Sequence, residues 1–306
     1  MKVQAKYSVI IPVFKLEGNP YLSSILKALS EQTLPPYEVH LVVGDNRQGR
    51  AINYGVSQIH TEYIATVDDD TQIDDSKLFE KLITAIDEDP DIGICGAACE
   101  IPDYASAFQK RAMRQIPRRY FPVTKLTCQS DMVQHPCLIM RRDLFLQIGG
   151  EDEELIRGLD PVLRKKVRDT GKKCVIVKDT WVYHLIPDSF FKLLKMYYRN
   201  GRGSGYASRN YPERVLELSD GNDNGTFVEK KPLIYRIFRR ILGVFTALLT
   251  FKILKLFTDL AYIYGVIQEK FIPSYVGISN VEEITTEIDE SYKTFKLYIH
   301  KVKLSN

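Results

Sequence analysis

The sequence lacks the features that mark several classes of protein. Its five cysteines form no CxxC pair and no cysteine–histidine ladder with zinc spacing, which excludes a disulfide framework and a structural zinc site. The first apolar run, Tyr7–Phe14, is short, contains a proline and has no small-residue cleavage site, so we expect no secretory signal peptide. Free thiols without a secretion signal predict a protein of the cytoplasm.

The composition is that of an ordinary globular chain. The chain has 306 residues, of which 44% are hydrophobic and 26% charged, enough for a sizeable buried core. These values exclude a wholly disordered protein, a collagen-like fibre and a multispanning membrane protein. A net charge of +3 is too small to indicate nucleic acid binding by itself.

The first hundred residues alternate between strand-like and helix-like patterns. Short β-branched and apolar runs predict buried strands, and apolar residues on one stripe predict helices. The predicted strands are 7–13, 38–43, 63–67 and 92–98, and the predicted helices lie near 22–29, 47–59 and 79–86. Alternation at this spacing indicates βαβ units, a parallel sheet and an α/β fold.

The second half of the chain is less regular. A charged helix is predicted over about 160–170, and a strand over 174–177. The run Gly201-Arg-Gly-Ser-Gly205 is glycine-rich, but it does not join a strand to a helix as a dinucleotide motif does. It fits either a mobile basic loop that closes over a diphosphate or a solvated linker. The run Ser219–Gly225 predicts a flexible linker.

The C-terminal tail contains the most apolar part of the chain, residues 233–267. Its longest uncharged run is Ile241–Phe251, shorter than the roughly 20 residues of a membrane-spanning helix, and Lys252 follows directly. Three arginines within 236–240 precede that run, which favours amphipathic helices in the interface of an anionic membrane. The alternative is a helical hairpin packed on the protein's own core or on a second subunit.

Three consecutive carboxylates, Asp68-Asp69-Asp70, come directly after a predicted buried strand. Like charges so close together repel each other unless a cation holds them, and ligands of open α/β sheets bind at this edge. Asp68 and Asp70, as alternate residues of an extended chain, can point the same way and bind one hard divalent cation. A solvated acidic turn is the other interpretation of this run.

In their order and spacing, several segments resemble family-2 glycosyltransferases of the GT-A fold. These segments are Ser8–Phe14, Val42–Asp45, Arg50–Gly55, Glu62–Asp70, Leu138–Phe145, Ile148–Gly150, Gly158-Leu-Asp160 and Val182–His184. The resemblance covers about residues 7–200. It implies a Rossmann-like, mixed but mostly parallel sheet flanked by helices, with the C-terminal amphipathic helices as an extension.

The resemblance also implies a division of the chain. Residues 1–100 would form the half that binds a nucleotide sugar, and residues 101–218 the half that builds the acceptor site. Beyond the resemblance, the apolar composition of the tail predicts that residues 226–306 form helices that bind a membrane or a second copy of the chain.

The implied reaction is an inverting transfer of a sugar from a nucleotide-diphosphate donor to an acceptor hydroxyl. Pro12 and Val13 would pack on the base of the donor. Asp45 would hydrogen-bond that base, and Arg50 would lie near the base or the phosphates.

The acidic residues would divide the chemistry between them. Asp68 and Asp69 would lie in the acidic motif at the donor, and Asp68, Asp70 and His184 would bind Mg²⁺ or Mn²⁺. Asp160 would be the general base on the acceptor hydroxyl. In-line displacement needs such a base on the acceptor's side and charge stabilisation on the diphosphate's side.

The tail leads us to expect a peripheral enzyme of polysaccharide biosynthesis at the inner face of the cell membrane. Its expected acceptor is a polyprenyl-linked or cell-envelope glycan. The basic run Lys110–Arg119 suits lipid headgroups or an anionic acceptor better than nucleic acid. One alternative is a soluble or protein acceptor, with the tail as a dimer interface. The other is a non-catalytic nucleotide-sugar-binding protein of a membrane assembly, because Gly158-Leu-Asp160 replaces the family's usual Gly-Glu-Asp.

Overall fold

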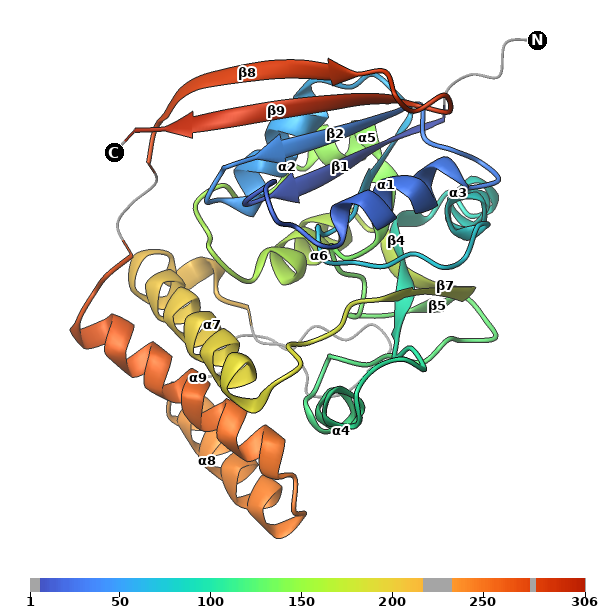
Figure 1. Ribbon diagram of the computed structural model, residues 1–306. Helices are drawn as coiled ribbons and strands as arrows, with labels where there is room; N and C mark the ends of the chain where they lie inside the picture. Colours follow the sequence, from blue (N-terminus) through green and yellow to red (C-terminus); the bar gives the residue numbers. More distant parts are fainter. Residues whose placement is uncertain (1–5, 217–232, 276–278, 306) are drawn as a thin grey trace.

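A nine-stranded sheet forms the centre of the computed structural model, which describes residues 6–216, 233–275 and 279–305 (Figure 1). From one edge to the other the strands are β5 (Cys128–Gln129), β7 (Lys173–Tyr183), β4 (Ile92–Glu100), β6 (Leu138–Arg141), β3 (Tyr63–Thr66), β1 (Tyr7–Val13), β2 (Glu38–Val43), β9 (Lys296–Leu304) and β8 (Val281–Asp289). The linker predicted at Ser219–Gly225 lies outside the described residues.

The strand directions confirm the predicted mixed, mostly parallel sheet. β1 pairs in parallel with both β2 and β3, so the carboxyl ends of these three strands meet at one edge. β6 runs antiparallel between β3 and β4, and β7 is parallel to β4. After β1 the chain adds β2 on one side of it and then β3 on the other side. Open α/β sheets bind their ligands at the carboxyl edge beside such a change in strand order.

Helices cover both faces of the sheet, which explains why its strands read as continuous apolar runs. On β1, Val9 and Ile11 pack into the cluster on one face, and Ile10 packs into the cluster on the other. The first face carries α1 (Leu22–Ser30) and α3 (Leu78–Glu88), and the second carries α2 (Gln48–Ser57), α5 (Arg142–Gln147) and α6 (Leu159–Asp169). A capping box formed by Ser106 and Gln109 begins a further helix, α4 (Ala107–Gln115).

The glycine-rich run is part of a helix, so its interpretation as a loop or linker is wrong. α7 (Phe190–Asn210) continues through Gly201–Gly205 and packs against α9 (Ile253–Phe271). A Cβ on Gly201 would lie 2.0 Å from the carbonyl oxygen of Tyr262, and one on Gly265 would lie 2.2 Å from that of Tyr198. The glycines are therefore needed because the two helix backbones touch.

A buried carboxylate strengthens the same helix–helix contact. Glu269 of α9 is fully buried, and its carboxylate accepts hydrogen bonds from Arg202, at 3.0 Å, and Arg209, at 3.3 Å. The backbone N–H groups of Ser274 and Tyr275 each donate to it at 3.2 Å. A buried charge is tolerated only when paired and hydrogen-bonded. These bonds fix α9, and with it the tail, to α7.

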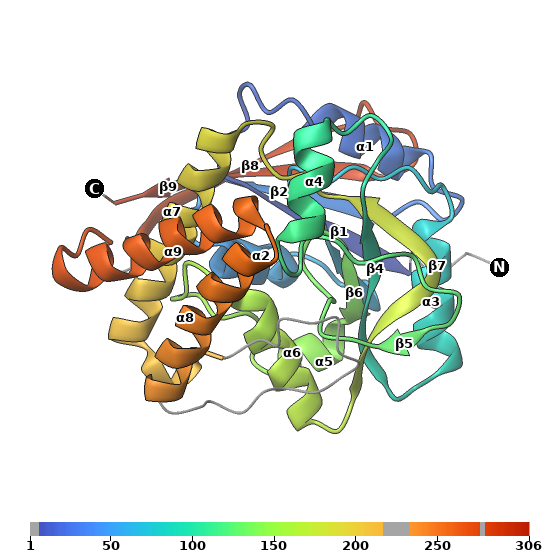
Figure 2. The ribbon, with the colours of Figure 1, turned by 90° about the horizontal axis from the view of Figure 1, so that it is seen from below.

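The tail begins as the predicted helical hairpin, which confirms a C-terminal helical extension. α8 (Leu233–Leu249) and α9 lie beside α7 on one side of the molecule (Figures 1 and 2). Among the residues that the structure describes, no helix combines the length and apolarity needed to span a membrane.

The tail does not end as helices, contrary to the prediction for 226–306. Val281–Asp289 and Lys296–Leu304 form an antiparallel hairpin, and β9 pairs in parallel with β2 (Figure 1). The physical reason is the period of the sequence. β8 is rich in Val, Ile and Thr, lysines alternate with apolar residues in the second half of β9, and Leu297 and His300 of β9 are buried.

The contact between α7 and α9 predicts opposite effects for two glycine substitutions. Gly265→Ala places a methyl group into the backbone of α7 and should lower the free energy of unfolding by about 1–3 kcal/mol. The matched control is Gly243→Ala in α8, where a Cβ meets only the Lys255 amine at 3.9 Å. There the higher helix propensity of alanine should stabilise the protein by up to about 1 kcal/mol. Urea unfolding measures both, and equal midpoints would contradict the backbone contact.

Candidate active site

The acidic loop and the predicted late histidine meet at the carboxyl edge of the sheet. The loop follows β3, and His184 directly follows β7. Gln72 and Tyr183 exchange backbone hydrogen bonds of 2.8 and 2.9 Å, which bring these segments together. The pairing places His184 beside Asp70, although many residues separate them in the chain.

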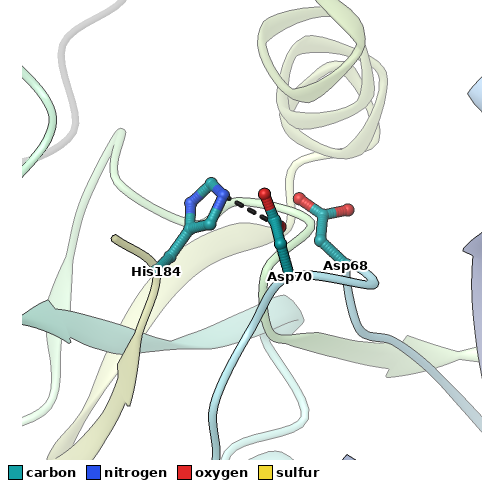
Figure 3. Close-up of side chains that lie close together, drawn as sticks. All are labelled: Asp68, Asp70 and His184. Atoms are coloured by element: carbon teal, nitrogen blue, oxygen red, sulfur yellow. Dashed lines mark ion pairs between the residues drawn. The ribbon is translucent and has the colours of Figure 1, made fainter. Parts of the chain in front are cut away.

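Asp68, Asp70 and His184 lie side by side (Figure 3). One ligand atom of each residue lies within 4.8 Å of the other two, and His184 Nε2 is 3.1 Å from Asp70 Oδ1. Two carboxylate oxygens and one imidazole nitrogen are donors that suit Mg²⁺ or Mn²⁺. The structure thus brings the three predicted metal-binding residues together.

The electrostatics of the loop also suit a cation. Burial, together with the charge of Asp70, raises the pKa of Asp68 to about 6 against the lowering effect of His184. Burial likewise raises the pKa of Asp69 to about 6. Burial lowers the pKa of His184, but the Asp70 carboxylate outweighs this effect and raises it. Carboxylates this close resist ionisation together, and a divalent cation would relieve the repulsion.

Two amide side chains hold the acidic loop, and no sequence pattern pointed to them as site residues. Gln48 of α2 donates to Asp68 Oδ1 at 2.8 Å. Asn19 donates to Asp69 Oδ2 at 3.0 Å, and its own oxygen accepts from the backbone N–H groups that begin α1, including that of Tyr21 at 2.9 Å. Asp69 is therefore held by Asn19 and lies outside the group formed by Asp68, Asp70 and His184. The only signal in the sequence was a turn-forming Asn-Pro dipeptide.

The residues predicted to contact the donor base lie after β1 and β2. The side chain of Val13 is 1% exposed and belongs to the core, so the prediction that it packs on the base is wrong for its side chain. Pro12 is half-buried. Asp45 accepts two hydrogen bonds from Arg50, at 2.7 and 2.8 Å, and Arg50 also donates to the carbonyl of Ser279 at 2.7 Å. A base bound by Asp45 would replace part of this ion pair.

Asp160 stands in the first turn of α6, and its position depends on Gly158. Gly158 has φ +88, a left-handed conformation that favours glycine, and α6 begins at the next residue. The positive end of the helix dipole stabilises an ionised carboxylate there. Asp160 Oδ1 accepts a hydrogen bond of 2.8 Å from the backbone of His135. Asp160 and His135 lie close enough to the acidic loop for their charges to act on the pKa of Asp68, and the carbonyl of His135 accepts a hydrogen bond of 3.4 Å from Thr66 at the end of β3.

Two arginines add positive charge beside the carboxylates. Arg119 donates to the hydroxyl of Tyr197 at 3.1 Å, and its charge acts on Asp70. Arg157 lies over Gly203 of α7, where a Cβ would meet its side chain at 2.7 Å. Burial and the charge of Arg119 lower the pKa of Arg157. The basic run had suggested Arg119 as part of a headgroup-binding patch, whereas Arg157 was not predicted as a site residue.

Comparisons with known proteins agree with this geometry. Residues 40–149 match the family described as Glycosyl transferase family 2. No curated protein matches the sequence. Among solved structures, the mannosyltransferase PcManGT from Pyrobaculum calidifontis, in complex with GDP-Man and Mn²⁺, is similar with a TM-score of 0.56 and 12% identity over 88% of each chain.

Two further structures have lower TM-scores. S. aureus TarS 1–349 in complex with UDP-GlcNAc has a TM-score of 0.47 and 16% identity over 70% of this chain and 68% of that one. The catalytic domain of Drosophila beta1,4galactosyltransferase 7, in complex with xylobiose, has a TM-score of 0.47 and 10% identity over 98% and 95%. At 12% identity, the likeness to PcManGT concerns the fold, and it confirms the predicted GT-A class.

The group of three ligand atoms predicts a specific loss of metal affinity. Asp70→Asn should weaken Mn²⁺ binding at pH 7.5 by about tenfold or more, because the substitution removes one of the two carboxylates among the three ligands. Asp74→Asn is the matched control, since this exposed carboxylate lies four residues further along the same loop. Titration of free Mn²⁺ by electron paramagnetic resonance measures the affinity. Equal affinities for the two variants would exclude a metal site at Asp70.

Proposed function

We propose that the chain, of which residues 40–149 match the family described as Glycosyl transferase family 2, catalyses an inverting transfer of a sugar from a nucleotide-diphosphate donor to an acceptor hydroxyl. One observation carries the proposal. Asp68, Asp70 and His184 converge at the carboxyl edge of the sheet, and the carboxylate of Asp160 belongs to the same group of interacting charges.

On the donor side, Asp68, Asp70 and His184 would hold a divalent cation. Such a cation supplies charge neutralisation for a leaving diphosphate. Arg119 and Arg157 add positive charge at the same edge, where they attract the donor and orient its phosphates. PcManGT was solved with GDP-Man and Mn²⁺, which makes this pair the first choice of ligands to test.

On the acceptor side, Asp160 would take the proton of the attacking hydroxyl. The oxygen–carbon bond to the acceptor forms as the carbon–oxygen bond to the diphosphate breaks, and the electron pair leaves with the diphosphate. Burial raises the pKa of Asp160, but the neighbouring His135 outweighs this and holds it well below its usual range. The carboxylate is therefore ionised, as a general base must be.

The tail helices support a membrane-bound acceptor. Their exposed large apolar residues recur at helical spacing and form one stripe on each helix, which together we call the apolar face. It consists of Phe238, Ile241, Leu242, Phe245, Leu248 and Leu249 on α8 and of Ile253, Phe257, Leu260, Tyr264, Ile267 and Phe271 on α9. Gly265 lies on the side of α9 that packs against α7. The apolar stripe of α9 lies on its opposite side and therefore remains exposed in the folded protein.

An anionic bilayer is the occupant that fits the apolar face best. Lys252 and Lys270 are exposed near the two ends of α9, and Lys195 is exposed on neighbouring α7. Cations around an apolar surface favour the headgroups of anionic lipids over a second, equally cationic copy of the chain. We therefore expect a peripheral enzyme on the inner face of the cell membrane that glycosylates a polyprenyl-linked or cell-envelope glycan.

Asp160 gives the decisive test of the reaction. Thermal shifts with UDP- and GDP-sugars, with and without Mn²⁺, identify the donor, and release of the nucleoside diphosphate measures transfer to water. Asp160→Asn should keep the donor-dependent shift and lower the release rate by about 10²–10⁴. Asp169→Asn, an exposed carboxylate at the other end of α6, should change neither. A full rate in Asp160→Asn would contradict its assignment as the base.

The apolar face predicts selective binding to membranes. The full chain should float with vesicles that contain phosphatidylglycerol and bind less to pure phosphatidylcholine. Phe245→Ser together with Phe257→Ser should abolish flotation, whereas Leu126→Ser, which alters a residue 75% exposed elsewhere, should not. A dimer in light scattering that the paired substitution dissociates, with no flotation of the wild type, would show that a second copy covers this face.

A further inference from the structure

A buried histidine lies between two carboxylates beside the candidate active site. His135 is 3% exposed, and its Nδ1 is 2.5 Å from Asp160 Oδ1. On the other side of the ring, Nε2 is 2.9 Å from Glu151 Oε1. The backbone N–H of His135 donates to the same Asp160 oxygen. His135 was not among the residues that the sequence predicted for the site.

This arrangement fixes the protonation state of the ring. An ionised carboxylate only accepts hydrogen bonds, so each ring nitrogen must carry a hydrogen to bond its neighbour. Burial lowers the pKa of His135, but the charges of Asp160 and Glu151 raise it well above its ordinary value. The ring is therefore an imidazolium between two carboxylates, and the group carries one net negative charge.

We propose that His135 is a positioning residue of the transfer: a permanent imidazolium, anchored by Glu151, that keeps Asp160 ionised and fixes its orientation toward the acceptor. The inference rests on the proposed function, because it gives His135 a role through Asp160. Both hydrogen bonds between His135 and Asp160 go to Oδ1, so Oδ2 is the oxygen left to take the acceptor's proton. His135 itself cannot accept that proton, since both ring nitrogens are already protonated.

The packing around this group supports a positioning role. Glu151 is 4% exposed, and its backbone N–H donates to Asn53 of α2 at 2.8 Å. The carbonyl of His135 accepts from Thr66 of β3 at 3.4 Å. The backbone of His135 is thus tied to β3 and that of Glu151 to α2, while the side chain of Asp160 is 33% exposed and open to a substrate.

The charges that face Asp160 determine its response to pH. His135 and Arg164 of α6 lower its pKa, and the carboxylates of Glu151 and Asp68 are the negative groups of the same cluster. His135→Gln removes the nearest positive charge, so the pKa of Asp160 should rise by about one unit or more. Protonation would then remove the base at a higher pH than in the wild type.

Two measurements test the inference with the full chain. Nitrogen-15 NMR of histidine-labelled protein at pH 7.5 should show both ring nitrogens of His135 protonated, and Glu151→Gln should weaken that signature. The second measurement is nucleoside-diphosphate release from GDP-mannose or UDP-N-acetylglucosamine, whichever gives the Mn²⁺-dependent thermal shift. In His135→Gln the kcat of this release should fall by about tenfold or more with the KM for the donor unchanged, because the donor site does not contain His135 while Asp160 loses its orientation.

The outcomes separate the inference from the proposed function. A neutral His135 ring, or a His135→Gln variant whose kcat is unchanged or whose kcat and donor KM change together, would overturn the positioning role and leave only a structural one. A fully active Asp160→Asn with an intact imidazolium signal would instead overturn the assignment of the base. Should His135→Gln fail to fold, Glu151→Gln carries the same test, because it loosens the anchor without changing the shape of the side chain.

Discussion

The crowding of negative charge at the carboxyl edge of the sheet is the constraint on which the site depends. Asp68, Asp70 and Asp160 lie there within one electrostatic group, and carboxylates in a partly buried place resist ionising together. Two histidines relieve part of the repulsion, each beside one aspartate: His184 with Asp70 and His135 with Asp160. On both sides of the proposed reaction, a histidine imidazole therefore keeps a carboxylate charged.

Helix α7 connects this site to the tail. Gly203 lies under Arg157 at the site, while Gly201 lies against the backbone of α9. One glycine-rich run thus shapes both a cationic side of the site and the contact that holds the tail helices. Because Glu269 adds ion pairs to that contact, the apolar face is held at a fixed place relative to the site, as an enzyme acting on a membrane-presented acceptor would need.

The sequence predicted the elements whose side chains follow a simple period. The first four strands appeared as buried apolar runs, and the helices between them as stripes, because burial on both sheet faces requires those patterns. The glycine-rich run was misinterpreted as a loop, since glycine is rare inside helices unless another backbone lies against it. The β8–β9 hairpin was missed because the strongly apolar segment 233–267 led to a helical prediction for the whole tail, although β8 is rich in Val, Ile and Thr.

By itself, the sequence determined the fold class, the acidic loop at the edge of the sheet and its association with His184. The fold class and the acidic loop follow from periodicity, whereas the association with His184 is what the resemblance to family-2 glycosyltransferases implied. Only the tertiary structure decided that Val13 faces the core, that Asn19 holds Asp69 and that His135 joins Asp160 to a second carboxylate. Such pairings join isolated polar residues from distant segments. They leave no period in the sequence, because strand register and helix packing alone bring their atoms within hydrogen-bond distance.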